Sequence, residues 1–137
     1  MATAFRTATY EAVWTALDGN ISGVTLFDYV PGEDLGSPTA NKPYAVLEGG
    51  DTAPMDNDSK RGVYLEMALH IFSDSLGRAE IDAKVDAAYA LLHRATLVPG
   101  AGYTHVDCLV LQTQVFVLDD AKTRHGILRL RATIQEA

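Results

Sequence analysis

The sequence predicts an α+β domain in which two helices pack on a mostly antiparallel sheet, with the elements in the order α-β-β-β-α-β-β. Three observations predict this fold. Two segments carry apolar residues at helical spacing, residues 62–72 alternate strictly, and residues 108–134 contain two strand-like runs around a polar turn. The chain has 137 residues, of which 47% are hydrophobic and 21% charged, as in ordinary globular domains. We therefore expect residues 1–137 to form a single domain with a sizeable core.

The first helix is expected over residues 3–17, where apolar residues recur on one face and Gly19 is placed to end the helix. Residues 23–30 predict a short strand. Residues 31–42 contain proline and glycine at positions that break any period, so they predict a loop.

A second strand is expected over Tyr44–Glu48, followed by an acidic run at 49–59 that is either a hairpin tip or a mobile loop. The clearest strand is Gly62–Phe72. One set of its side chains is uniformly aliphatic and should face the helices (Val63, Leu65, Met67, Leu69, Ile71). The alternate set is mixed, so its face should be covered only in part, which leaves room for another subunit (Tyr64, Glu66, Ala68, His70, Phe72).

The second helix is expected over residues 78–95, with Gly77 as its N-cap and Glu80 at the third helical position. Residues 108–118 and 124–134 predict a closing β-hairpin.

Acidic residues are concentrated in the first part of the chain. Residues 1–58 carry nine of them against only Arg6 and Lys42, and the rest of the chain is balanced, so the first part accounts for the whole net charge of −7. A sequence pI near 4.9 argues against a protein that wraps nucleic acid. The asymmetry is either an ordinary solvated face or the mark of a subunit whose acidic and basic edges meet neighbours in a ring.

The sequence predicts no catalytic, cofactor or metal site. His105 and Cys108 have H-x-x-C spacing, but no second ligand pair accompanies them, as a structural zinc site requires. Residues 56–58 lack the further oxygen ligands of a calcium loop, and Gly100–Gly102 lacks the third glycine of a dinucleotide fingerprint. We expect His105 at the start of a strand, Cys108 as a small core residue, and no enzyme.

No apolar run approaches the roughly 20 residues of a membrane-spanning helix, and residues 1–10 lack the pattern of a secretion signal. With one cysteine, the chain forms no internal disulfide. The composition predicts a soluble protein, made inside the cell, that has no membrane partner.

Basic residues gather late in the chain. Arg129 and Arg131 share one strand face at a spacing of two, so their guanidinium groups should project side by side. They either cap an exposed sheet face, or pair with acids of the same domain, or pair with carboxylates of an adjacent subunit, for which arginine offers bidentate geometry. Nucleic-acid binding is the weakest interpretation, because the net charge is negative and no aromatic residues interleave with the arginines.

Several segments occur in an order typical of one family. These are Tyr10–Leu17, Tyr29-Val30-Pro31, Pro43-Tyr44-Ala45-Val46, Leu69–Ser73 with Gly77–Glu80, and the hairpin Thr123–Arg131. Over nearly its full length the chain resembles the phage tail completion proteins, also called tail terminator proteins, of long-tailed phages and gene transfer agents. Phe72 stands where this family commonly has a tryptophan, which keeps an aromatic residue there.

The resemblance implies a structural virion protein without catalysis or cofactor. Such a protein forms a ring, generally of six subunits, on the last ring of the tail tube, stops tube growth and offers the surface for head–tail joining. The implied partners are copies of itself, the tail tube protein and the head–tail connector or neck proteins, while DNA passes through the lumen without specific binding. The implied location is the tail or neck of the virion, assembled in the host bacterial cytoplasm. Another neck or connector component, and a small intracellular ligand-binding domain, remain as alternatives.

A closed ring needs two different, complementary edges on each subunit. We expect Arg124, Arg129 and Arg131 to lie at a subunit interface. An acidic lumen would repel DNA phosphates, so part of one acidic loop is expected to face the channel or an axial face of the ring. The candidate residues are Asp51, Asp56 and Asp58 in one loop and Glu33 and Asp34 in another.

Overall fold

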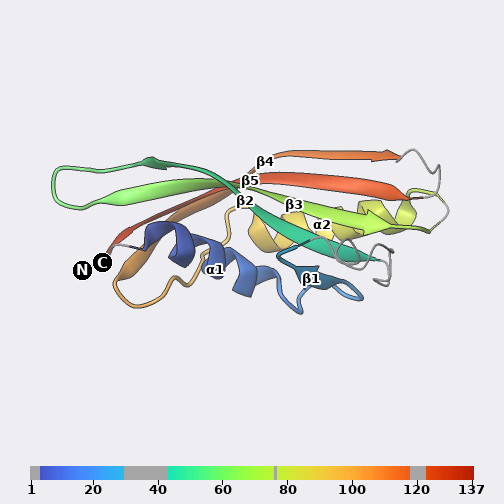
Figure 1. Cartoon of the computed structure of the whole chain (residues 1–137), viewed down its shortest axis with the longest axis horizontal. Helices are drawn as coiled ribbons and strands as arrows, with labels where there is room; N and C mark the ends of the chain where they lie inside the picture. Colours follow the sequence, from blue (N-terminus) through green and yellow to red (C-terminus); the bar gives the residue numbers. More distant parts are fainter. Residues whose placement is uncertain (1–3, 30–42, 76, 118–122) are drawn as a thin grey trace.

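The structure is a computed structural model, and it describes residues 4–29, 43–75, 77–117 and 123–137. The predicted fold class and element order are confirmed (Figure 1). The elements in these ranges are α1 (Phe5–Leu17), β1 (Thr25–Phe27), β2 (Tyr44–Pro54), β3 (Gly62–Ser73), α2 (Ala79–Leu92), β4 (Tyr103–Val117) and β5 (Arg124–Glu136).

The described strands form one sheet in the order β1-β2-β3-β5-β4. β1 runs parallel to β2, and every other neighbouring pair is antiparallel. The ladder between β3 and β5 is uninterrupted from Gly62 opposite Gln135 to Ser73 opposite Arg124. The last strand of the chain therefore lies inside the sheet, and β4 lies at an edge.

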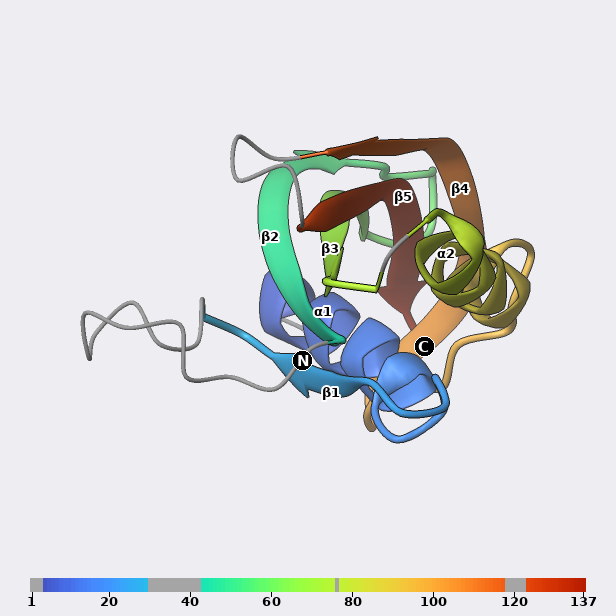
Figure 2. The same cartoon turned by 90° about the vertical axis from the view of Figure 1, so that its right-hand side faces the viewer.

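Both helices lie on one face of a strongly curved sheet (Figures 1 and 2). The aliphatic set of β3 faces them as predicted, with Leu69 and Ile71 fully buried. These side chains share one core with Leu17 of α1, Ile81 of α2 and Leu128 of β5. Burying this apolar surface contributes roughly 25 cal/mol per Å², and it is the main force that holds the helices on the sheet.

Within the described residues the opposite face of the sheet carries no helix, and we call it the helix-free face. On β3, Ala68 is buried there, Tyr64, His70 and Phe72 are half-buried, and Glu66 is exposed. The prediction that this face is covered only in part is confirmed.

The second strand is longer than predicted. β2 continues past Glu48 to Pro54, so the acidic run is a strand followed by the turn of a hairpin with β3. A register shift between Gly49 and Thr52 accommodates the glycine pair. At Gly50 a Cβ atom would lie 2.5 Å from the Glu66 carbonyl oxygen, so only glycine fits this close approach of the two strands.

Other boundaries also differ. β1 spans only three residues of the expected 23–30, and the predicted loop at 31–42 lies outside the described residues. The prediction that Gly77 caps α2 is wrong, because Arg78 occupies that position without a side-chain capping bond. Glu80 accepts a hydrogen bond from the Ser73 hydroxyl instead (2.5 Å). α2 ends at Leu92, three residues early, and Arg94 has a positive φ of 60° just beyond it.

α2 packs directly on the backbone of β5 at Gly126. A Cβ atom at this position would lie 2.6 Å from Cγ2 of Val85 and 3.3 Å from Cδ1 of Ile81. The valine is branched and cannot swing away, so the helix must shift to admit any side chain. The glycine thus sets the distance between helix and sheet.

We predict that Gly126→Ala lowers the free energy of unfolding by about 1–3 kcal/mol through overpacking. Adding Val85→Ala should recover part of this loss, so that the double variant is more stable than the sum of the single changes indicates. Urea unfolding measures both effects. Gly100→Ala is the matched control, because a Cβ atom there meets nothing within 4 Å. Equal stability of Gly126→Ala and Gly100→Ala would contradict the packing argument.

Candidate interaction surfaces

Arg129 and Arg131 lie together on the helix-free face, as their spacing predicts. On β5 they stand opposite Ala68 and Glu66 of β3. The guanidinium carbon of Arg131 lies 5.5 Å from the centre of the Tyr64 ring, a cation–π arrangement, whereas Arg129 is exposed. Among the described residues neither arginine lies within ion-pair distance of a carboxylate. Both charges are therefore free to meet an external partner.

Arg124 does not join this pair. It stands opposite Ser73 at the other end of β5, on the face that carries the helices. Its Nε atom is buried and has no hydrogen-bond partner in the described structure. The three predicted interface arginines thus form one pair and one separate residue.

The predicted acidic loop is likewise divided. Asp51 lies in β2, is exposed, and lines a groove of about 530 Å³ on the helix-free face together with Glu48, Glu66 and Arg129. The structure therefore places Asp51, a predicted channel residue, and Arg129, a predicted interface residue, in the same groove. Glu33 and Asp34 lie outside the described residues.

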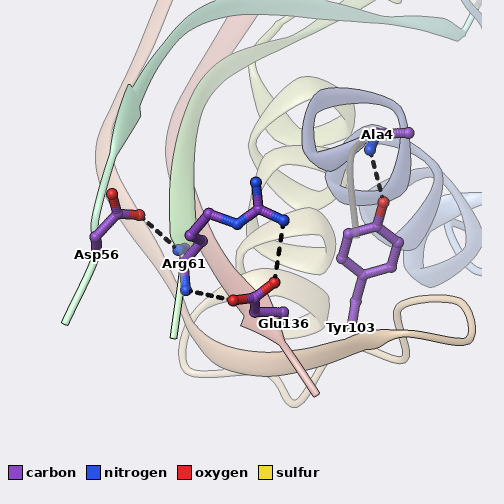
Figure 3. A network of polar contacts seen from close by, with 6 residues as sticks. Ala4, Asp56, Arg61, Tyr103 and Glu136 are labelled. Carbon is purple, nitrogen blue, oxygen red and sulfur yellow. Dashed lines mark hydrogen bonds and ion pairs between the residues drawn. The ribbon is translucent and has the colours of Figure 1, made fainter. Parts of the chain in front are cut away.

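Asp56 and Asp58 lie in the turn between β2 and β3. Asp56 Oδ1 accepts a hydrogen bond from the Gly62 amide (3.0 Å), which ties the two sides of the turn (Figure 3). Glu136 accepts bonds from the amide and the guanidinium of Arg61, at 2.9 and 3.3 Å, and these bonds hold its pKa below the ordinary value. Because its carboxylate bonds the Gly62 amide, Asp56 has a structural role that the sequence did not reveal. The side chain of Asp58 is exposed.

A histidine pair lies among aromatic rings at the other end of the helix-free face. His70 Nδ1 and His125 Nε2 are 2.9 Å apart, so the two rings share one hydrogen. The His125 ring also contacts Phe72 and Phe116, with centroid distances of 4.4 and 4.7 Å. Burial, and then the proximity of His70, lowers the pKa of His125 to about 4. Burial also lowers the pKa of His70, against the opposing effect of Glu48.

His105 and Cys108 do not form a ligand pair. His105 is the third residue of β4, near the start of a strand as predicted, and its Nδ1 atom accepts a hydrogen bond from the Leu97 amide (3.3 Å). Cys108 is fully buried in the core as predicted, and burial followed by the charge of Asp107 raises the pKa of its thiol to about 11. A thiol in this state is a weak nucleophile and a poor metal ligand at neutral pH. No cluster of three metal-ligating side chains occurs within the described ranges.

Sequence reasoning missed a groove between α1 and the outer edge of β2. It encloses about 870 Å³ and is lined by Arg6, Tyr10 and Trp14 of the helix and by Glu48 and Gly49 of the strand. The Tyr10 hydroxyl donates to the Leu47 carbonyl (2.6 Å), and desolvation by burial and then the charge of Asp28 raise its pKa. The stacked rings of Tyr10 and Trp14 form the helical wall.

The apolar edge at the end of β4 was missed as well. Its side chains are exposed from Leu111 to Val117, including Val115 and Phe116. Two apolar triplets, 109–111 and 115–117, break the alternation that a half-buried strand should show. This broken pattern was the available signal. Neither described helix is long and apolar enough to cross a membrane.

The histidine pair predicts a pH dependence of stability. In the unfolded chain a histidine titrates near pH 6.5, so between pH 6.5 and about 4 the unfolded state binds more protons than the folded state. The stability due to neutral His125 is complete above pH 6.5 and is lost as the pH falls toward 4. Because the pair keeps some contact with solvent, we expect a loss on the order of 1 kcal/mol.

His125→Phe removes this titration and keeps a ring between Phe72 and Phe116. Urea unfolding at several pH values should therefore show a shallower decline for the variant than for the parent. Parallel declines would show that His125 is not the group responsible.

The comparisons with known proteins agree with this architecture. A search of curated proteins finds no match. A solved structure described as the virion of a native gene transfer agent (GTA) particle contains a similar chain, with a TM-score of 0.77 and 22% identity. The match covers 98% of this chain and 99% of that one, and it shows that the two share a fold. The family model described as "Tail completion protein gp17" matches residues 11–135. The chain therefore belongs to the tail completion protein gp17 family and is a structural, tail-associated protein of the virion.

Proposed function

We propose that this protein is a tail terminator that forms a closed ring of six subunits on the end of the tail tube. The ring stops tube growth and presents the surface to which the head–tail connector or neck proteins bind. The match of the family model over residues 11–135 carries this proposal. The function requires no cofactor and no reaction, and assembly takes place in the host bacterial cytoplasm.

The edges of the sheet support ring formation. A cyclic assembly of identical subunits needs a head-to-tail contact between two different surfaces of each copy. The sheet has such surfaces, because its two edges differ. At one edge β1 covers the first residues of β2, and at the other edge lies β4.

The unpaired arginines are proposed to act in this contact. Arg129 and Arg131 project from the helix-free face with no carboxylate in ion-pair distance among the described residues, so carboxylates of a neighbouring subunit can bind them. Arg124, on the other face and nearer the hairpin end, would contact a separate part of the neighbour.

The exposed acids are proposed to face the channel or an axial face of the ring. Asp51 and Asp58 have exposed side chains, and Asp56 extends this acidic patch while it holds the turn. Repulsion between these carboxylates and DNA phosphates would let DNA pass without binding. Glu33 and Asp34 are the second candidates for this role.

We expect the protein to cap growing tail tubes. Light scattering behind a sizing column should give roughly 89 kDa for a free ring of six copies of 14.8 kDa; if the ring forms only on tubes, the protein should instead elute together with short tubes. Electron microscopy should show shorter tubes when the protein is added during tube polymerisation. Copurification of the protein with the connector but not with tubes would favour another neck component. A protein that stays monomeric and does not bind tubes would overturn the proposal.

Reversing both arginines, Arg129→Glu with Arg131→Glu, should abolish the ring and the capping of tubes. The fold should persist, because neither residue makes an ion pair in the described structure and the lost cation–π contact is worth about 0.5–1 kcal/mol. Circular dichroism and urea unfolding check the fold, and Arg129→Glu alone is the milder variant. Intact rings from the folded double variant would show that these arginines are not at the interface.

Reversing the exposed acids should make the ring bind DNA. Asp51→Lys with Asp58→Lys leaves Asp56 and its bond to Gly62 in place. We expect measurable, salt-sensitive retention of duplex DNA by the variant ring and none by the parent ring. Asp86→Lys with Asp18→Lys, at exposed positions of or beside the helices, gives the same change of charge as a control. Equal retention by both variants would mean that the position of the acids is irrelevant.

A further inference from the structure

The outer edge of β4 is divided into a covered half and an open half. In the covered half, the segment after α2 supplies partners: the Arg94 amide donates to the Cys108 carbonyl (2.8 Å), and His93 Nδ1 accepts from the Val110 amide (3.1 Å). A register shift follows between Val110 and Gln112. From there to Val117, no contact of this kind with the outer edge is found within the described residues.

The open half of β4 is unusually apolar for an edge. Leu111, Val115, Phe116 and Val117 are 50%, 39%, 42% and 46% exposed. Exposed apolar side chains beside unpaired backbone groups favour pairing with a strand of another chain. Soluble proteins normally protect such an edge with lysine, proline or a covering loop. Neither lysine nor proline occurs between 111 and 117.

The opposite end of the sheet offers a second open edge. β1 pairs only with Tyr44–Val46, and the Tyr10 hydroxyl satisfies the Leu47 carbonyl. From Glu48 onward the outer edge of β2 has no described strand beside it, and the groove against α1 borders its first residues.

The directions of the two edge strands are compatible. β3 is antiparallel to both β2 and β5, and β4 is antiparallel to β5, so β4 and β2 run in opposite directions. Rotation about the ring axis keeps the up or down direction of each strand along that axis, even where the strands are tilted. The β4 edge of one copy would then meet the β2 edge of the next as an antiparallel pair, the more stable kind of ladder.

The contact requires the two edge strands to be offset along their length, and this offset matches the one found in closed sheets. Following the ladders across the sheet of one subunit, Gln112 of β4 lies level with Arg129 of β5, Ala68 of β3 and Glu48 of β2. Residues 111–117 are therefore level with residues 43–49, part of which already pairs with β1. An offset of about five residues, roughly 16 Å, moves them onto 48–54 instead. Over four strands, about 19 Å wide, this offset corresponds to a tilt of about 40°, within the 35–45° typical of closed sheets.

Charge supports the same contact. The groove beside the β2 edge is lined by the acids Glu11, Asp28 and Glu48 and by one base, Arg6. Residues 111–117 contain no acid, and Arg129 lies beside them opposite Gln112. An acidic edge would therefore meet an apolar edge that contains no acid, without like-charge repulsion.

We propose that residues 111–117 of one copy pair antiparallel with residues 48–54 of β2 in the next copy and join the sheets into one continuous ring. The occupant of each open edge is a second copy of this chain. This inference rests on the proposed ring and specifies how its subunits meet.

Disulfide cross-linking between variants that each carry one added cysteine tests the contact. The offset places Gln114 opposite Asp51, and the native Cys108 is buried, so we would mix Asp51→Cys with Gln114→Cys under mild oxidation in the presence of tail tubes. A covalent dimer should dominate on a non-reducing gel. Mixing Asp51→Cys with Val98→Cys is the matched control, because Val98 is 82% exposed but lies outside both edges, and it should give at least tenfold less dimer.

A second variant tests the edge without cross-linking. Val117→Glu places a carboxylate at the apolar edge facing acids, and it should weaken ring formation at least tenfold, whereas Val98→Glu should not. Rings that form and cap tubes but fail to cross-link, and that tolerate Val117→Glu, would overturn the edge contact and leave the proposed function intact. The absence of any ring with tubes present would instead refute the proposed function.

Discussion

The continuous ladder between β3 and β5 is the constraint on which the rest of the structure depends. It joins Gly62–Ser73 to the last strand of the chain without a bulge, so each residue pair has a fixed face. One face receives the aliphatic residues on which α1 and α2 pack, and the other receives Arg129, Arg131 and the histidine pair. A slip of one residue would bury the arginines and expose the core.

This ladder also decides where the sheet ends. Because β5 inserts beside β3, β4 is displaced to one edge, and β2 is left at the other with only three residues of β1 beside it. Both edges are therefore consequences of strand order, and the surfaces available for assembly follow from the same pairing that builds the core. The two bulges in β4 belong to this arrangement, since the second one marks the point where the edge becomes open and apolar.

The sequence was sufficient for the fold and for part of the surface. The alternation in residues 62–72 predicted the central strand and its buried face, and the spacing of Arg129 and Arg131 predicted that they project together. The extent of β2 was missed, because the pair Gly49-Gly50 taken alone predicts a turn. In the sheet the pair forms an irregularity within the strand, where Gly50 lies close to the backbone of Glu66. The α1 groove and the β4 edge were missed for a related reason. The broken alternation of residues 109–117 was a local signal for the exposed apolar side chains of β4, but local periodicity does not encode which distant strands pair, and this pairing decides which strands lie at an edge.

The two titratable groups with the largest pKa shifts are shifted by burial. The Cys108 thiol, with a pKa of about 11, and the His125 ring, with a pKa of about 4, are both uncharged near neutral pH. They are shifted because burial disfavours their charged forms, as in a packed interior. By contrast, Arg129 lacks an ion-pair partner among the described residues, and the apolar side chains of β4 lack a cover. The unsatisfied groups are those that a neighbouring protein can satisfy, and a head-to-tail contact in a ring would satisfy both at once.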